Sequence, residues 1–186
     1  MQPLNALEQS RHLHPHWQDN DNLLTLLQHN AKNYPTQIAM RERDHGIWQE
    51  YSWQDYLQQV LGFAAGLEQL GVKKGDIVLI LGDNRPALYF AMLGAIALCA
   101  IPSPAYPDTT PEELSGQIQR EAIRCAVAED QEQVDKLLNV VQLQGEKNLI
   151  QTIIYDDRRG LDQQAHALTQ AFDDIVQQGL QRLQQE

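Results

Sequence analysis

The sequence predicts an α/β protein: a mainly parallel sheet with helices on both faces, plus a small N-terminal β-hairpin. Two observations support this fold class. Between residues 70 and 160, short apolar segments alternate with segments of helical period, which is the pattern of successive βαβ units. One of the short segments, residues 77–81, has five consecutive apolar residues and no polar alternation. Both of its faces should therefore be covered, as in a central parallel strand.

The N-terminal part of the chain is predicted to hold an arm, a helix and the hairpin. Residues 1–20 show no periodic pattern and are expected to form a flexible arm. Leucines on one helical face predict a helix from Leu23, which Tyr34-Pro35 ends. Two short apolar segments then flank Asp44-His45-Gly46, where the glycine permits positive φ, so a hairpin is predicted.

A second helix is predicted after this hairpin. Ser52 is a good N-cap, apolar residues from Tyr56 to Leu70 recur every three or four positions, and Gly71 ends the helix. Gly62 and Gly66 lie four residues apart within it. This spacing of small residues predicts close packing against a neighbouring element.

The middle of the chain alternates between strands and helices. Strand 77–81 leads through Gly82–Pro86 into a buried helix that runs to Leu98, with Asn84 as its predicted N-cap. Ile101-Pro102 is predicted to begin a second strand-like segment, and four prolines between residues 102 and 111 predict a stiff loop over the sheet edge. The remaining patterns predict helices over 112–120 and 131–140, and strands over 123–128 and 149–155.

The last segment, residues 161–186, is predicted to form one amphipathic terminal helix. Its apolar residues fall on a single stripe: Leu161, Ala165, Leu168, Phe172, Ile175, Val176, Leu180 and Leu183. Nothing later in this sequence covers the stripe, so the helix is expected to dock on the sheet, to bind a partner, or to mark the truncation point of a longer chain. The predicted organisation is an arm (1–20), an α/β unit (21–160) and this helix (161–186).

Composition narrows the possible partners and compartments. The chain has 14 Lys plus Arg against 25 Asp plus Glu, a net charge of −11, which predicts no nucleic-acid partner because phosphate backbones need a basic footprint. Residues 87–101 form the longest apolar run, which is too short to cross a bilayer. The N-terminus lacks a secretory pattern. We expect a cytoplasmic protein without a transmembrane segment, peripheral membrane association being left open, and Cys99 and Cys125 as buried, reduced thiols.

The sequence contains no recognisable catalytic motif. A glycine-rich phosphate loop, a G-x-S-x-G elbow, an H-E-x-x-H pair and an activated Cys near a His are absent. His12, His14 and His16 alternate, but no Cys or carboxylate stands at ligand spacing, so no metal site is predicted. Adjacent carboxylates are interpreted as helix starts or solvated faces. Asp156-Asp157, in the loop after the last predicted strand, fits that interpretation least well.

Several short motifs nevertheless occur in a distinctive order. They are Tyr51-Ser52-Trp53, Leu70-Gly71-Val72 with Gly75-Asp76, Asn84-Arg85-Pro86, and a proline-rich loop that ends at Tyr106-Pro107. Together they resemble the N-terminal region of AMP-forming acyl-CoA synthetases, the adenylate-forming superfamily. Downstream, Ile153 to Leu161 is similar to a stretch of the long-chain fatty acyl-CoA synthetase branch. Cys99 departs from the family, which usually has glycine there, as does Arg158, where this branch often has proline.

The resemblance implies an N-terminal fragment of an ATP-dependent long-chain fatty acid–CoA ligase. Such an enzyme uses ATP, Mg²⁺ and CoA, and forms an acyl-adenylate before the acyl-CoA. The family's catalytic motifs would lie beyond Glu186, in the missing remainder of the chain, so no catalytic residue is assigned. The fragment is expected to be inactive and to have no cofactor bound. Substrate-binding positions implied here are Asn84, Arg85, Pro102 and Tyr106, lining or bracing the acyl or pantetheine passage. Homo-oligomers through exposed apolar surface are also expected.

Two other interpretations remain open. The chain is also consistent with a complete small α/β protein that binds an acyl chain or a partner through its terminal helix, without catalysis. An unrelated nucleotide-binding domain of the flavodoxin or response-regulator kind is the third. The lack of a glycine-rich loop and of an acidic cluster after the first strand argues against it.

Overall fold

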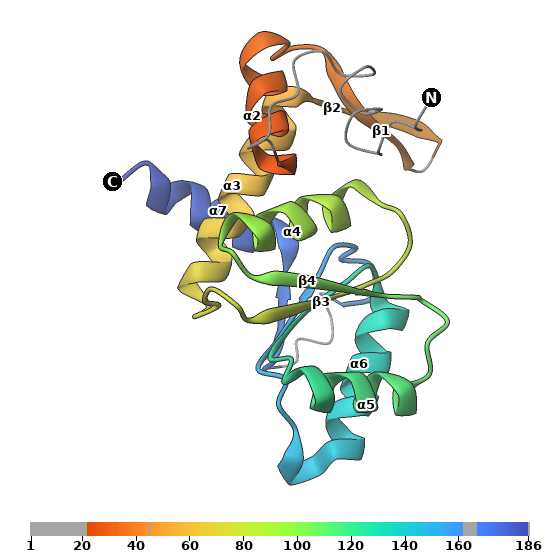
Figure 1. Cartoon of the computed structure of the whole chain (residues 1–186). Coiled ribbons are helices and arrows are strands. Elements are labelled where there is room, and N and C mark those ends of the chain that lie inside the picture. The colour runs from red at the N-terminus through yellow and green to blue at the C-terminus, as the bar shows by residue number, and fades with distance from the viewer. Residues whose placement is uncertain (1–21, 45, 162–166, 186) are drawn as a thin grey trace, which may run out of the picture.

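The computed structural model describes residues 22–44, 46–161 and 167–185, in which helices alternate with parallel strands (Figure 1). The elements are α2 (Leu23–Asn33), β1 (Ile38–Asp44), β2 (Ile47–Ser52), α3 (Trp53–Gln69), β3 (Ile77–Leu81), α4 (Pro86–Ala97), β4 (Ile101–Ala105), α5 (Pro111–Glu121), β5 (Cys125–Ala128), α6 (Gln131–Gln144), β6 (Thr152–Tyr155), β7 (Thr169–Ala171) and α7 (Phe172–Leu183). The predicted fold class is confirmed: a five-stranded parallel sheet and a separate two-stranded hairpin, β1–β2. The predicted arm, with its three histidines, lies outside the described residues.

Strand β3 lies inside the sheet, whose order is β4-β3-β5-β6-β7 with every neighbouring pair parallel. Val78 and Ile80 face a core beneath α2, α3, α4 and α7, whereas Leu79 and Leu81 face a second core beneath α5 and α6. Figure 1 shows these helical layers on opposite sides of β3 and β4. All four side chains are at most 3% exposed, which explains the unbroken apolar run.

The starts of two helices show where local sequence signals succeed and fail. The hydroxyl of Ser52 accepts the Asp55 N–H at 3.1 Å, and the Asp55 carboxylate accepts the Ser52 N–H at 2.9 Å, so the predicted start of α3 is confirmed. Asn84, however, does not cap α4. Pro86 holds the preceding Arg85 in an extended conformation, so Arg85 becomes the N-cap and makes no side-chain capping bond.

The strand-like start predicted at Ile101-Pro102 is confirmed, but the strand continues to Ala105, into the stretch predicted to be a loop. Residues 101–105 form β4, which pairs only with β3 among the described strands and therefore has one open edge. Pro102 and Pro104 have no N–H to donate, and an edge strand needs no donor on its open side. Prolines at these positions are therefore compatible with an edge strand, although they would disrupt a central one.

The predicted single helix over residues 161–186 is wrong in its first half. Thr169–Ala171 pairs with β6 as strand β7, and α7 begins only at Phe172. This segment pairs with the edge of β6 that β5 leaves open. The Ile153 N–H donates to the Leu168 carbonyl at 2.8 Å. Leu161 is buried with the α5–α6 core, on the face of the sheet opposite the core that holds Ile175, so the two did not share one helical stripe.

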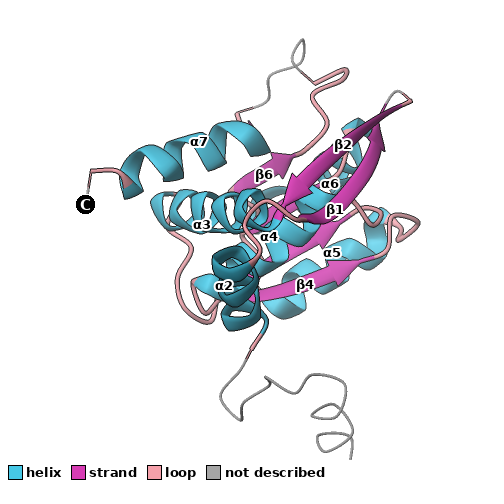
Figure 2. Ribbon diagram, turned by 90° about the horizontal axis from the view of Figure 1, so that it is seen from above, coloured by secondary structure: helices cyan, strands magenta, loops and turns pink. Residues whose placement is uncertain are grey.

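Helix α7 packs against α3 through glycines on both helices, and Figure 2 shows the two helices side by side. A Cβ atom on Gly66 would lie 2.5 Å from the Ile175 carbonyl oxygen, and one on Gly179 would overlap the Gly62 carbonyl and lie 2.7 Å from the Gly66 nitrogen. Because these neighbours are backbone atoms, a side chain at Gly66 or Gly179 would fit only if the two helices moved apart. The close packing predicted for Gly62 and Gly66 is confirmed.

Replacing Gly179 should therefore separate the two helices. We expect Gly179→Ala to lower the free energy of unfolding by about 3 kcal/mol, measured by urea denaturation. Gly116→Ala is the matched control in α5, because a Cβ there meets only the tip of the Arg120 side chain at 3.1 Å. That control should be neutral or up to about 1 kcal/mol more stable. Equal effects of the two substitutions would contradict the glycine-mediated contact.

The two cysteines differ, so the prediction of two buried thiols holds only for Cys125. Cys99 is exposed and has φ of 56°, in the left-handed region just after α4. Its N–H donates to the Ile96 carbonyl at 2.9 Å, as in a helix-terminating turn. This conformation explains why glycine suits the position.

Cys99→Gly should raise the free energy of unfolding by about 1 kcal/mol, because a left-handed conformation costs an L-residue about 1–2 kcal/mol and part of that gain is offset by the entropy of glycine. Thermal or urea denaturation measures the change. Cys99→Ala removes the thiol but keeps the backbone strain, so it should show no such gain. A gain with alanine as large as that with glycine would attribute the effect to the thiol.

Candidate functional site

The carboxyl ends of β3, β5 and β6 meet at one edge of the sheet, where open α/β sheets usually bind ligands. The strand order matches the flavodoxin-like doubly wound order, in which the ligand crevice opens between the first and third strands. Here those strands are β3 and β5. The residues that follow them, Gly82 to Arg85 and Glu129-Asp130, therefore stand at the position where a ligand site is expected.

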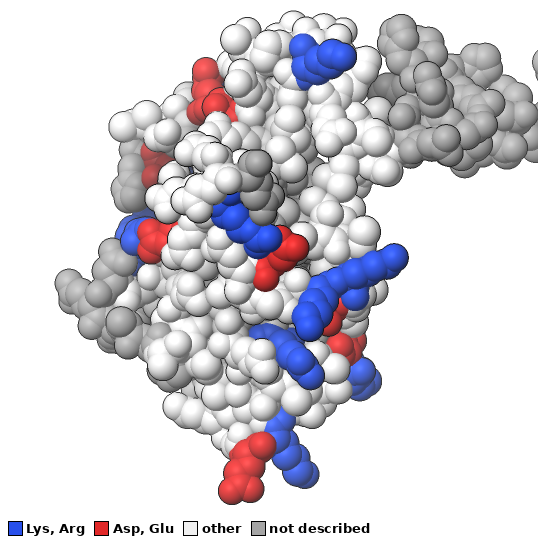
Figure 3. All heavy atoms as spheres, turned by 90° about the vertical axis from the view of Figure 1, so that its left-hand side faces the viewer, with Lys and Arg blue, Asp and Glu red and all other residues white. Residues whose placement is uncertain are grey.

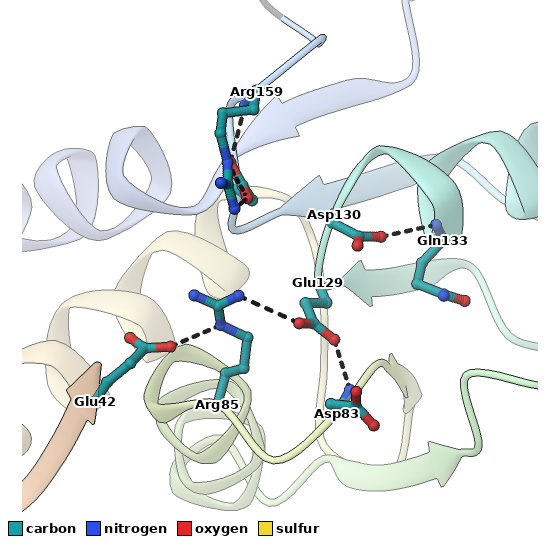
Figure 4. A network of polar contacts seen from close by, with 8 residues as sticks. Glu42, Asp83, Arg85, Glu129, Asp130, Gln133 and Arg159 are labelled. Atoms are coloured by element: carbon teal, nitrogen blue, oxygen red, sulfur yellow. Dashed lines mark hydrogen bonds and ion pairs between the residues drawn. The ribbon is translucent and has the colours of Figure 1, made fainter. Parts of the chain in front are cut away.

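Arg85 fills this position with an ion-pair network, shown in Figure 4. Its Nε donates to Glu42 of β1 at 2.7 Å, and one terminal nitrogen donates to Glu129 at 3.3 Å. The second carboxylate oxygen of Glu129 accepts the Asp83 N–H at 2.7 Å. The three charged side chains are 12–24% exposed, so these are half-buried pairs. Arg85 thus joins the hairpin, the start of α4 and the end of β5.

The same network makes the loop after β3 a poor cradle for a nucleotide phosphate. A phosphate site at a strand-to-helix turn needs free backbone N–H groups. The Asp83 N–H already donates to Glu129, and the Arg85 N–H donates to the Asp83 carbonyl at 2.9 Å. Carboxylates surround the turn and would repel an anion. Among the described residues, this turn therefore does not offer a site for the phosphates of ATP.

The Asp156-Asp157 pair consists of two unlike carboxylates. Asp157 is held by Arg159, whose Nε donates to it at 2.6 Å, and hydrogen bonding to Arg159 lowers its pKa. The Asp156 carboxylate makes no hydrogen bond or ion pair within the described part of the chain. Burial, together with the nearby carboxylates of Glu42 and Asp173, raises the pKa of Asp156 to about 7, although Arg85 partly opposes this.

Asp156 lies in a hollow of about 400 Å³ between the hairpin and the end of β6. Its walls are formed by charged and polar side chains from several elements: Glu42, Asp44, Gln49, Tyr51, Arg85, Asp156, Asp157, Arg158, Arg159 and Asp173. Burial, followed by repulsion from Glu42, also raises the pKa of Tyr51. We name this hollow the acidic hollow. No group of three or more His, Cys, Asp or Glu arranged to hold a metal ion occurs among the described residues.

A second hollow brings together two of the four predicted site residues. A groove of about 380 Å³ runs between the loop after β3 and the end of β4. Asn84 and Tyr106 both line it, with Pro104 and Pro107. The Tyr89 hydroxyl donates to the Asn84 side-chain oxygen at 3.3 Å, and Tyr106 is 80% exposed at the rim. Of the other two, Arg85 lines the acidic hollow, and Pro102 lies in β4 outside the residues that line either hollow.

The Arg85 network was not predicted, because Glu42 and Glu129 lie 43 and 44 positions from Arg85. Glu129-Asp130 was considered only as an adjacent carboxylate pair and was interpreted as a helix start or a solvated face. On the face shown in Figure 3, acidic and basic side chains are interspersed. No helix among the described residues is both long and apolar enough to cross a bilayer.

Comparison with known families decides the affiliation. The model of the AMP-binding enzyme family matches residues 27–182, most of the chain. The chain belongs to the AMP-binding enzyme family. The predicted resemblance to the N-terminal region of this family is thereby supported. The match does not distinguish the long-chain branch from the others.

Two relatives of this chain are much longer proteins. It is 35% identical over 77 residues to 4-coumarate–CoA ligase 3 of Arabidopsis thaliana, which is 41% of this chain and 14% of that protein. It is 34% identical over 101 residues to pyochelin synthase PchD of Pseudomonas aeruginosa, covering 54% of this chain and 18% of the relative. The chain therefore matches less than a fifth of the length of these relatives. A third relative, Uncharacterized protein Rv1549 of Mycobacterium tuberculosis, is matched over a larger share of its own length. The two are 32% identical over 97 residues, which are 52% of this chain and 54% of that protein.

Solved structures share the fold. The A-PCP didomain of carboxylic acid reductase from Segniliparus rugosus, in complex with AMP, superposes with a TM-score of 0.71 and 16% identity over 88% of this chain and 27% of that one. A benzoate CoA ligase from Burkholderia xenovorans gives a TM-score of 0.66 and 19% identity over 84% of this chain and 28% of that one. At these identities the comparison shows a shared fold, and the shared part is less than a third of each neighbour.

Removing Arg85 should leave two half-buried carboxylates without their partner. We expect Arg85→Gln to lower the free energy of unfolding by about 2 kcal/mol, measured by urea denaturation. Arg41→Gln is the matched control, because Arg41 pairs with Glu50 at 3.1 Å but both side chains are about half exposed. The control should change stability by about 0.5 kcal/mol or less. Similar losses in both variants would show that burial of the Arg85 network adds nothing.

Proposed function

We propose that this chain is the N-terminal part of an AMP-forming acid–CoA ligase, and that the intact enzyme acts on a long-chain fatty acid. The observation that carries the proposal is the family match over residues 27–182, joined to relatives and structural neighbours that are named as CoA ligases. The similarity of Ile153 to Leu161 to the long-chain branch favours a fatty acid. The 4-coumarate–CoA ligases match at most half of this chain, so their named substrate does not set the substrate here.

The proposed reaction has two steps. The fatty acid carboxylate attacks the α-phosphate of ATP, releasing pyrophosphate and forming an acyl-adenylate; the CoA thiol then displaces AMP to give acyl-CoA. ATP, Mg²⁺ and CoA belong to the intact enzyme, with stabilisation of phosphate charge supplied by residues outside this chain. The contribution of the described residues is a rigid wall. Asn84 and Tyr106 border the acyl or pantetheine passage, while Arg85 and Pro102 brace it.

We further propose that the intact enzyme is cytoplasmic, with peripheral association at a membrane, and that its exposed apolar surface favours assembly. The described apolar residues that remain exposed include Tyr106 at 80% and Ile101 at 52%, both at the β4 edge. In the intact enzyme this edge would meet the remainder of the chain. In the isolated chain it would favour self-association.

The isolated chain should bind ATP no better than millimolar and should not turn it over. Isothermal titration of residues 1–186 with ATP and with palmitate, together with a pyrophosphate-release assay, tests this. Far-UV circular dichroism under the same conditions confirms that the chain is folded. Saturable, acid-dependent pyrophosphate release by the isolated chain would refute the assignment to a non-catalytic N-terminal part.

A complete small protein without catalysis is the second candidate, and one observation favours it. The 97 residues aligned with the Mycobacterium tuberculosis relative are 54% of that protein, so it is itself only about 180 residues long. A chain of this size therefore occurs in the family. A stop codon directly after Glu186 in the native reading frame, with a stable monomer or heteromer in solution, would favour this candidate. A reading frame that continues for hundreds of codons would favour the ligase.

A further inference from the structure

The β1–β2 hairpin is a sheet separate from the five-stranded one, and its outer part stands away from the core. Along β2, Ile47 and Trp48 are 66% and 61% exposed, so the outer part of the hairpin is open to solvent. Its inner part is held by apolar packing, in which Met40 and Tyr51 contact the core, and by an ion pair. The Tyr51 ring packs edge-on against Phe90 of α4 with centroids 5.3 Å apart, and Glu42 accepts the 2.7 Å hydrogen bond from Arg85. The Glu42–Arg85 ion pair is the charged part of this attachment.

The Glu42–Arg85 ion pair borders the acidic hollow, which contains one carboxylate without a partner. Asp156 faces charged and titratable groups from each element around it: Glu42 and Asp44 of β1, Tyr51 of β2, Arg85 at the start of α4, Asp157, Arg158 and Arg159 of its own loop, and Asp173 of α7. Arg159 donates to Asp157, and Arg158 donates to Asp174 at 2.6 Å. Arg85 is shared by Glu42 and Glu129, so no cation is dedicated to Asp156.

We propose that the protonation state of Asp156 controls how firmly the β1–β2 hairpin is held to the sheet, closing the hairpin below neutral pH and loosening it above. When Asp156 is neutral, Arg85 is shared only by Glu42 and Glu129. When Asp156 is ionised, it repels Glu42 and competes with it for Arg85. Both effects act against the same hairpin contact. The hairpin is the two-state element, and the acidic hollow is its sensor.

The sign of the effect follows from linkage. The carboxyl of Asp156 titrates near pH 7 in the folded chain and near pH 4 in an unfolded one, so the folded, closed form binds the proton more tightly. The stabilisation from this proton is present at low pH and is lost as pH rises through that interval. Above about pH 7 the ionised carboxylate remains beside Glu42. The hairpin should therefore be looser at pH 8 than at pH 6.

Hydrogen–deuterium exchange of the full chain at pH 6 and pH 8 tests the proposal, with rates divided by the intrinsic exchange rate at each pH. Peptides over residues 38–52 should lose roughly fivefold protection at pH 8, the lower end of typical coupling between linked equilibria. Peptides over α5 and α6 should stay unchanged. Asp156→Asn should keep the hairpin protected at both pH values.

Two controls separate Asp156 from other titrating groups. Asp108→Asn makes the same charge change in an exposed loop and should behave like the wild-type chain. An effect of His45, which stands between β1 and β2 in the sequence, would persist in Asp156→Asn. The proposal is overturned if the wild-type hairpin shows equal protection at both pH values, if Asp156→Asn keeps the wild-type pH dependence, or if protection falls equally over α5 and α6.

Discussion

Cover on both faces of β3 is the constraint on which the rest of the structure depends. Four aliphatic side chains alternate between two cores, and burying each one contributes about 2 kcal/mol. Such a strand is stable only with a helical layer on each side. The chain satisfies this by sending α4 over one face to reach β4 and α5 over the other to reach β5. Because β4 is added on one side of β3 and β5 on the other, the direction of strand addition reverses here. The position of the candidate site therefore follows from covering this one strand.

Two further contacts complete this arrangement. Helix α7 packs against α3, and the Arg85 network joins the hairpin to the carboxyl edge of the sheet. Glycines let α7 approach α3 closely enough for Phe172 to stack on Phe63, with ring centroids 4.5 Å apart. At the carboxyl edge, Arg85 and Glu129 satisfy polar groups and join the hairpin to the sheet. The position at which related sheet orders bind phosphate is thus taken by carboxylates. Membership of the AMP-binding enzyme family therefore does not place its nucleotide chemistry among the described residues.

Much of this fold was predictable because its causes are local. The run at 77–81, the Ser52 capping box and the Gly62–Gly66 spacing each act within a few residues, and each prediction was confirmed. The errors arose where tertiary context decides. Pro102 and Pro104 are tolerated because β4 is an edge strand, and residues 169–171 form a strand because β6 offers an open edge. The acidic hollow could not be predicted from sequence for the same reason. Asp156-Asp157 was singled out as a pair, but its neighbours Glu42 and Arg85 are distant in sequence.

Native-state hydrogen exchange across the sheet and the α3–α7 contact tests the central claim most directly. If cover on both faces of β3 organises the molecule, the amides of β3 and β5 should exchange only through global unfolding, with the lowest rates in the chain. The amides of α7 should share the opening free energy of α3, since the glycine contact joins them in one unit. Fast exchange in β3, or opening of α7 independently of α3 and the sheet, would contradict this claim.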